Sequence, residues 1–131
     1  MADSEFQIEL LVRDYECDMQ GVVNNAVYQN YLEHARHEYL KSRGLDFAQL
    51  TAEGIIVVVV RAELDYLRSL RSGDRCHVTV STYRASRLRL GFRQSIVHAV
   101  TGQPVMRATI FTTAVNDKGR PWLPERLLAL L

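Results

Sequence analysis

Residues 13–43 read RDYECDMQGVVNNAVYQNYLEHARHEYLKSR and contain the change of pattern that decides the fold. From Asn25 onward, apolar residues recur at spacings of three and four, which is the period of an amphipathic helix. We therefore predict one long helix over 25–43, with Asn24 or Asn25 as its N-cap and Gly44 in the left-handed conformation after it. The apolar stripe comprises Tyr28, Tyr31, Leu32, Ala35 and Tyr39, and the polar face comprises Gln29, Asn30, Glu33, Arg36, His37 and Lys41.

The segments on either side of this helix have the period of strands. Residues 5–14 alternate between apolar and polar, which predicts a first strand. After residues 45–54, period two returns in four more segments, separated by turn signals such as the one at 72–74. This order predicts an α+β fold in which a five-stranded antiparallel sheet curls around one helix. A ferredoxin-like fold fits less well because it needs two comparable helices, and the last few residues are expected to form a short helical turn.

The composition excludes several classes of protein before any motif is considered. The chain has 131 residues, 47% of them apolar, and a formal net charge of +1. This length suits a single domain over residues 1–131, and the small net charge lacks the basic excess of a nucleic-acid binder. No apolar run approaches the ~20 residues that span a bilayer, and two cysteines are too few for a disulfide framework, so a cytoplasmic protein is expected. The histidines and cysteines show no zinc-like spacing, so no metal or other cofactor is expected.

The loop before the predicted helix holds candidate catalytic groups. A helix N-terminus presents free backbone N–H groups and a positive dipole end, which suits a developing oxyanion. Asp18 lies within one loop length of that N-terminus, and Gly21 lets the backbone turn sharply. A carboxylate facing an oxyanion site suits hydrolysis of an activated acyl group, with Asp18 as nucleophile or as general base on water. On spacing alone, an ordinary turn and helix cap is the more common use of these residues.

The loop and helix together resemble the hotdog-fold thioesterases of the 4-hydroxybenzoyl-CoA thioesterase type. The matching motif is Asp18-x-x-Gly21-Val22-Val23-x-x-Ala26-x-Tyr28, followed by Tyr31-Leu32-Glu33-x-Ala35-Arg36. The resemblance implies a hotdog fold and hydrolysis of fatty acyl-CoA or acyl carrier protein thioesters. It further implies that Asp18 is the catalytic carboxylate, that the backbone N–H of Asn25 polarises the thioester carbonyl, and that Gly21 permits close approach.

Substrate and partner contacts are also expected from the sequence. One helix covers only part of a five-stranded sheet, so the uncovered apolar part predicts a homo-oligomer, a dimer or a tetramer, with the acyl group at its interface. Arg87 and Arg89 belong to an arginine-dense segment, which is either a solvated strand face or a phosphate-binding rim for CoA or an acidic carrier protein. The other expected substrate contacts lie near the loop and are Val23, Asn24, Tyr28 and Tyr31.

The sequence leaves two other functions open. A non-catalytic acyl- or CoA-binding module would have the same fold without releasing thiol. A dehydratase-type hotdog lyase needs a histidine close to its acid, and no histidine lies between Asp18 and the helix, which disfavours it. Glu33 and His37 lie four residues apart, so they are more simply a solvated or structural pair than a catalytic one.

Overall fold

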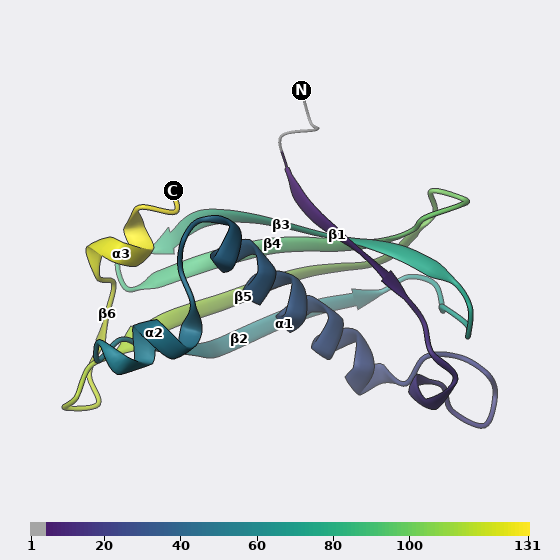
Figure 1. Ribbon diagram of the computed structural model, residues 1–131, viewed down its shortest axis with the longest axis horizontal. Helices are drawn as coiled ribbons and strands as arrows, with labels where there is room; N and C mark the ends of the chain where they lie inside the picture. The colour runs from purple at the N-terminus through teal and green to yellow at the C-terminus, as the bar shows by residue number, and fades with distance from the viewer. Residues whose placement is uncertain (1–4) are drawn as a thin grey trace.

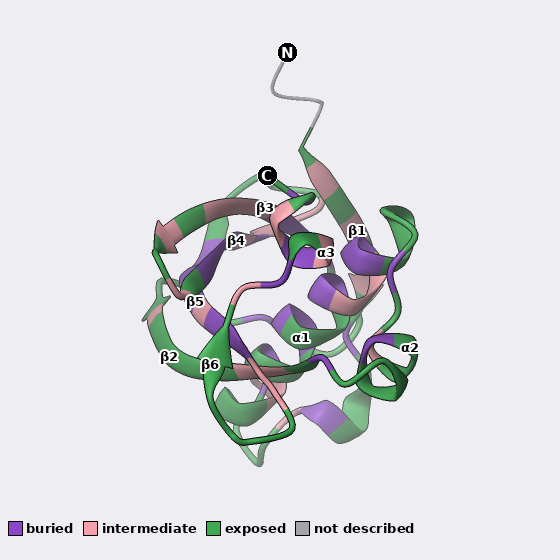
Figure 2. Ribbon diagram, turned by 90° about the vertical axis from the view of Figure 1, so that its left-hand side faces the viewer, coloured by how far each residue is buried: buried purple, intermediate pink, exposed green. Residues whose placement is uncertain are grey.

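A single long helix, α1 (Asn25–Ser42), lies in the concave face of a curled sheet in the computed structural model, which describes residues 5–131 (Figures 1 and 2). Asn24 is its N-cap, because the side-chain oxygen of Asn24 accepts a hydrogen bond from the N–H of Ala26 at 3.2 Å. Gly44 follows the helix with a φ of 78°. The prediction of this helix and of both its ends is confirmed to within one residue.

The sheet is antiparallel throughout, with the strand order β1-β3-β4-β5-β2 and β6 paired to the side of β5. The edge strand β2 is therefore far from β1 in the sheet, although β2 is the next strand after β1 in the chain. The strands are β1 (Phe6–Leu11), β2 (Ile56–Tyr66), β3 (Arg75–Ser86), β4 (Arg89–His98), β5 (Pro104–Val115) and β6 (Pro121–Trp122).

The predicted α+β class and the sheet curled around one helix are confirmed, whereas the smaller elements differ from the prediction. The sheet has six strands, because Pro121–Trp122 adds a two-residue strand beside β5. The first strand ends at Leu11 instead of residue 14, and a 3₁₀ turn, η2 (Asp14–Glu16), replaces its last part. A second helix, α2 (Phe47–Ala52), was not predicted, whereas the short C-terminal helix α3 (Glu125–Leu128) was.

The apolar stripe of α1 packs into the sheet as predicted, and all five of its members are buried. One residue assigned to the polar face was placed wrongly, because Arg36 is only 8% exposed and lies between α1 and the sheet. Its Nη1 donates to Oε1 of Gln94 on β4 at 3.0 Å, and Nε2 of Gln94 donates to the carbonyl of Leu32 at 3.0 Å. A guanidinium can be buried here because this polar side chain on the facing strand satisfies it.

The structure also bears on membrane spans, metal sites and the role of Cys76. No helix in the described part of the chain is both long enough and apolar enough to cross a bilayer. Residues 5–131 also contain no group of three or more His, Cys, Asp or Glu side chains arranged to hold a metal ion. Cys76 is fully buried on β3, and burial raises the pKa of its thiol to about 12, so it is a packing residue and not a nucleophile.

Candidate active site

The loop between β1 and α1 forms a tight, locally hydrogen-bonded turn, which we call the Asp18 loop (residues 17–24). A β-bridge between Cys17 and Val23 closes its base. Inside the turn, the N–H of Asp18 donates to the carbonyl of Val22 at 2.9 Å, and the N–H of Gly21 donates to the carbonyl of Asp18 at 3.0 Å. Gly21 adopts a φ of 78°, a left-handed conformation that favours glycine, so the turn depends on this residue.

The two carboxylate oxygens of Asp18 have different surroundings. Oδ1 accepts hydrogen bonds from the N–H of Gln20 at 2.8 Å and from the N–H of Val22 at 3.4 Å. Oδ2 has no hydrogen-bond partner among residues 5–131, and the residue is exposed. The loop therefore orients the carboxylate through one oxygen and leaves the other available to water or substrate.

The start of α1 supplies the complementary charge. Asn24 caps the N–H of Ala26, and the carbonyl of Asn24 accepts from the N–H of Val27 at 2.9 Å. The N–H of Asn25 has no acceptor within the described part of the chain. This free donor stands at the positive end of an 18-residue helix, where negative charge is stabilised.

A second chain segment, between β2 and β3, is hydrogen-bonded to the Asp18 loop. The carbonyl of Leu70 accepts from the N–H of Val23, and the N–H of Leu70 donates to the hydroxyl of Tyr28, both at 2.9 Å. The ring of Tyr28 meets that of Tyr66 edge-on, with centroids 5.7 Å apart. These contacts enclose a pocket of about 180 Å³, lined among others by Asp18, Val23, Asn25, Tyr28, Tyr66 and Arg68.

The residues that the sequence associated with this loop have three different places in the structure. Asp18, Val23, Asn25 and Tyr28 line the pocket, as just described. Gly21 and Asn24 lie beside it, the first forming the turn and the second capping the helix. Tyr31 lies behind the loop instead of in the pocket, because it is only 3% exposed and its hydroxyl donates to the Glu16 carboxylate at 2.6 Å.

The predicted phosphate-binding arginines, Arg87 and Arg89, lie at the other end of the molecule. The pairing of Leu11 with Arg75 places the start of β3 beside the end of β1 that leads to Asp18. Arg87 is in the turn after the opposite end of β3, about 36 Å along that strand, and both arginines are exposed (Figure 1). Within one chain, therefore, these arginines are not part of the Asp18 pocket.

Two neighbours of the pocket were missed from the sequence. Arg68, which lines it, follows the end of β2, and Glu16 is buried directly behind the loop. An isolated Glu or Arg in a connecting segment is most often solvated, so the local sequence does not mark either residue as part of a site. The available signal was the spacing of Arg13 and Glu16, opposite charges three residues apart that form a 3.0 Å ion pair.

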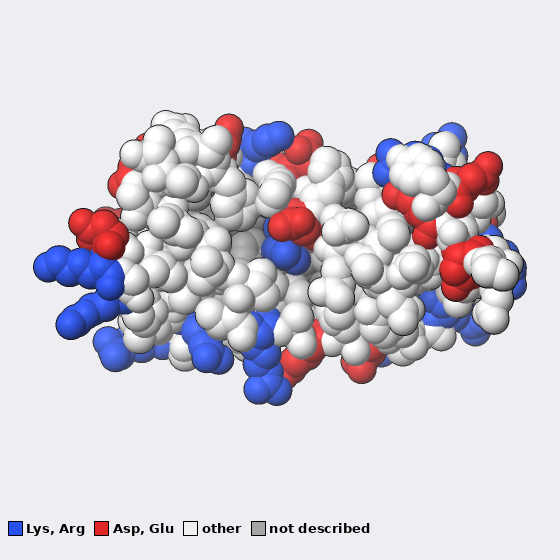
Figure 3. Space-filling view, turned by 90° about the horizontal axis from the view of Figure 1, so that it is seen from below, with Lys and Arg blue, Asp and Glu red and all other residues white. Residues whose placement is uncertain are grey.

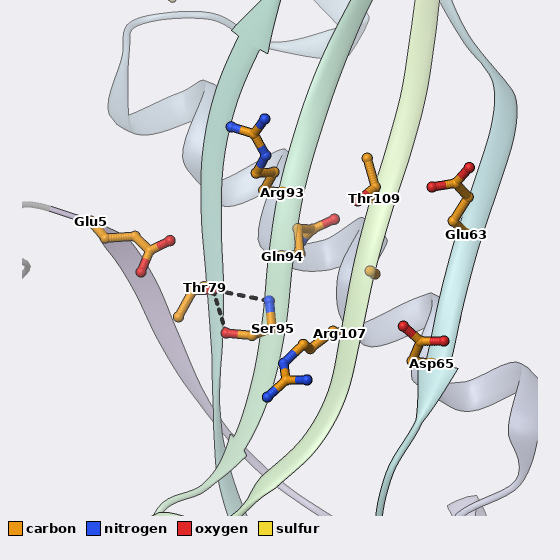
Figure 4. A pocket seen from close by; sticks show the side chains of 10 residues that line it. Glu5, Glu63, Asp65, Thr79, Arg93, Gln94, Ser95, Arg107 and Thr109 are labelled. Carbon is orange, nitrogen blue, oxygen red and sulfur yellow. Dashed lines mark hydrogen bonds between the residues drawn. The ribbon is translucent and has the colours of Figure 1, made fainter. Parts of the chain in front are cut away.

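A larger hollow, of about 330 Å³, lies on the outer face of the sheet, away from α1 (Figure 4). Glu63 and Asp65 of β2 face Arg93 and Arg107 of β4 and β5 across it. Both charge signs are present, and neither the Asp18 loop nor the helix N-terminus contributes to it. The smaller Asp18 pocket, which has the free carboxylate oxygen and the free N–H, is therefore the candidate active site.

Comparison with known proteins identifies the family of this chain. Residues 12–131 match the family described as the thioesterase-like superfamily. The chain belongs to this superfamily. It is 38% identical over 119 residues to the acyl-acyl carrier protein thioesterase ATL3 of Arabidopsis thaliana. This match covers 90% of this chain but only 63% of the Arabidopsis protein. It is 30% identical over 112 residues to the long-chain acyl-CoA thioesterase FadM of Escherichia coli, covering 86% and 84% of the two chains.

Solved structures agree with this assignment and confirm the predicted hotdog fold. A hypothetical protein from Aquifex aeolicus superimposes with a TM-score of 0.88 at 28% identity, covering 96% of this chain and 98% of that one. The 4-hydroxybenzoyl-CoA thioesterase of Pseudomonas gives a TM-score of 0.86 at 20% identity, covering 97% of this chain and 99% of that one. At that identity, the second likeness shows the fold alone.

Because Gly21 has a left-handed backbone conformation, adding a single methyl group at this position should change both stability and turnover. Replacing Gly21 with Ala should destabilise the protein by about 1–2 kcal/mol, because an L-residue is strained at this φ, and it should also lower turnover by shifting Asp18. The matched control is Gly119→Ala, since Gly119 has a φ of 74° in the turn between β5 and β6. Urea unfolding and steady-state kinetics should show similar destabilisation in both variants and lower kcat only for Gly21→Ala. Equal kcat values would contradict a catalytic role for this turn.

Proposed function

We propose that the protein is a thioesterase that hydrolyses fatty acyl thioesters at the Asp18 pocket. The observation that carries the proposal is the pairing, in one pocket, of a carboxylate oxygen and a helix N-terminal N–H that both lack a protein partner in residues 5–131. The N–H of Asn25 polarises the thioester carbonyl, and Asp18 either attacks that carbonyl or removes a proton from the attacking water. Membership of the thioesterase-like superfamily and the names of the relatives support this assignment.

The chemistry of each step follows from these two groups. As the nucleophile adds to the carbonyl carbon, negative charge moves to the carbonyl oxygen, where the Asn25 N–H and the α1 dipole stabilise it. Collapse of the tetrahedral intermediate breaks the carbon–sulfur bond and expels a thiolate, which takes up the proton that Asp18 removed from water in the general-base route, or a proton from solvent in the nucleophile route. If Asp18 is the nucleophile, the product of this step is an anhydride that water then opens; if Asp18 is the general base, water adds directly and the free acid forms in one stage.

The acyl chain is proposed to lie in the groove between α1 and β2. A hollow of about 250 Å³ begins at Gln29, roughly 6 Å along α1 from Asn25, and a second of about 210 Å³ continues toward Phe47. Both hollows share Val59 of β2 and the charged Glu33 and Arg36 of α1 as walls. Apolar side chains are well placed to hold an alkyl chain here, and they include Leu32 and Ile110 in the first hollow and Val57 and Phe92 in the second.

A second copy of the chain is proposed to cover this groove by pairing with β2. Strand β2 is a sheet edge with unpaired backbone groups, and its apolar residues Ile56, Val59 and Val60 are 44%, 52% and 42% exposed. An exposed apolar edge strand of 11 residues favours strand pairing with another chain. Seen from below, uncharged side chains cover most of the middle of the surface around one small charged group, whereas charged side chains lie along the rim and at both ends, with basic ones prominent at the left-hand end and acidic ones at the right-hand end (Figure 3).

Antiparallel pairing of two β2 strands gives the distant arginines a role. A two-fold axis at β2 makes the two copies point in opposite directions. The end of one copy that holds Asp18 then lies beside the end of the other copy that holds the turn between β3 and β4. Arg87 and Arg89 of the second copy are then at the same end as the Asp18 pocket. We propose that they bind the phosphates of the substrate thiol, which is CoA or the phosphopantetheine of an acyl carrier protein.

Asp18→Asn should lower kcat on acyl-CoA esters at least a hundredfold, because an amide neither attacks the carbonyl nor accepts a proton from water. The measurement is thiol release from acyl-CoA and acyl carrier protein thioesters of several chain lengths. Asp46→Asn is the matched control, since the exposed Asp46 carboxylate also accepts a backbone N–H, that of Ala48 at 2.7 Å, but caps α2. Full activity of folded Asp18→Asn would remove Asp18 from the mechanism, and saturable binding by the wild type without thiol release would indicate a binding module instead.

Val60→Lys should convert the proposed dimer into monomers and lower its activity, because it adds a charge to the pairing edge. Val100→Lys is the control, since Val100 is 81% exposed in the turn between β4 and β5. Sedimentation velocity gives the mass of each variant, and thiol release gives its activity. A wild-type protein that sediments as a monomer while fully active would contradict the role of β2 pairing.

A further inference from the structure

We infer that Glu16 and Tyr31 are positioning residues whose hydrogen bond holds the Asp18 loop against α1 and thereby sets the place of the Asp18 carboxylate relative to the N–H of Asn25. The inference rests on the proposed function, in which these two groups act on the thioester. Neither Glu16 nor Tyr31 lines the pocket, so each acts through Asp18 and not on the substrate.

The carboxylate of Glu16 is buried and surrounded by donors. It is 8% exposed and accepts from the Tyr31 hydroxyl at 2.6 Å, from the N–H of Arg13 at 2.9 Å and from Nη2 of Arg13 at 3.0 Å. The backbone carbonyl of Glu16 also accepts from the N–H of Asn24, the helix cap, at 2.9 Å. This one residue is therefore bonded to the chain before the Asp18 loop, to the end of that loop, and to α1.

The charges of this cluster make its central hydrogen bond strong. Burial opposes ionisation of Glu16, but the hydrogen bonds from Arg13 and Tyr31 outweigh it and hold its pKa below the ordinary value. Burial and the bond to Glu16 raise the pKa of the Tyr31 hydroxyl. At neutral pH, a protonated phenol thus donates to a carboxylate, and such charge-assisted bonds are short and about twice as strong as neutral ones.

Outside itself, the Asp18 loop is also bonded to the segment between β2 and β3, through the N–H of Val23 and a β-bridge between Val22 and Arg71. The bonds among Asp18, Gly21 and Val22 maintain the shape of the turn without fixing it to the helix. Tyr31 lies about 9 Å along α1 from Asn25, in a buried part of the helix. A misplacement of about 1 Å in a reacting group costs on the order of a hundredfold in rate, so a small movement of the loop would be visible in turnover.

The test is Tyr31→Phe, which removes only the hydroxyl. We expect kcat for acyl-CoA hydrolysis to fall about ten- to a hundredfold with little change in KM, because the groove and the rim are untouched. The matched control is Tyr39→Phe, on the same helix: Tyr39 is 7% exposed, and its hydroxyl lies 3.3 Å from Oγ1 of Thr82, away from the pocket. Each variant loses one hydroxyl that is hydrogen-bonded in the fold, at Tyr39 to Thr82 and Arg43, so both should unfold at a lower temperature, with the larger shift in Tyr31→Phe because its bond is charge-assisted. Only Tyr31→Phe should lose kcat.

Variants at the acceptor make the test independent of how Tyr31→Phe folds. Glu16→Gln keeps an oxygen that accepts from Tyr31 and should retain more of the wild-type kcat than Glu16→Ala. Tyr31→Phe combined with Glu16→Ala should be no worse than Glu16→Ala alone, because both changes break the same bond. Wild-type kcat in Tyr31→Phe, or equal losses in Tyr31→Phe and Tyr39→Phe, would overturn the inference.

Asp18→Asn, measured in the same assay, separates this inference from the proposed function. If Asp18→Asn turns over normally, the proposed function fails, and the positioning role fails with it. If Asp18→Asn is inactive while Tyr31→Phe and Glu16→Ala are fully active, the proposed function stands and only the positioning role is overturned. A loss of kcat in Tyr31→Phe that Tyr39→Phe does not share supports both.

Discussion

The attachment of the Asp18 loop to the start of α1 is the constraint on which the rest of the site depends. A free N–H at a helix N-terminus has catalytic value only if a nucleophile or base is held a fixed distance from it. Here Asn24 fixes the helix start, and the contacts of Glu16 and Val23 hold the loop beside it. The positive end of the helix dipole and the free carboxylate oxygen of Asp18 thus face the same pocket.

The sheet supports this unit and also leaves room for a substrate. Seven residues of α1 are buried, including all five of its apolar stripe, so the helix is held against the concave face along most of its length. One helix cannot fill the whole face, and the remaining space lies between α1 and the edge strand β2. The apolar residues of β2 are exposed, and a groove lies beside them, because the sheet is wider than the single helix that it wraps.

Sequence patterns predicted the elements whose residues show a regular period and missed the features that depend on residues far away in the chain. The helix period over 25–43 and the strand alternation are local, whereas the two residues of β6 and the six of α2 are too short to show a period. Arg36 was assigned to the polar face because its partner, Gln94, is 58 residues away. The opposite locations of Arg87 and Asp18 likewise follow from the strand order and register, which no local pattern contains.

The carbonyl stretching frequency of a bound thioester tests the central claim most directly. An acyl-CoA labelled with ¹³C at the thioester carbonyl would be bound to the Asp18→Asn variant and measured by difference infrared spectroscopy. Polarisation by the N–H of Asn25 and the α1 dipole predicts a frequency lower than that of the same ester in water. A bound carbonyl whose frequency equals or exceeds the value in water would contradict the account, because the start of α1 would then not act on the carbonyl.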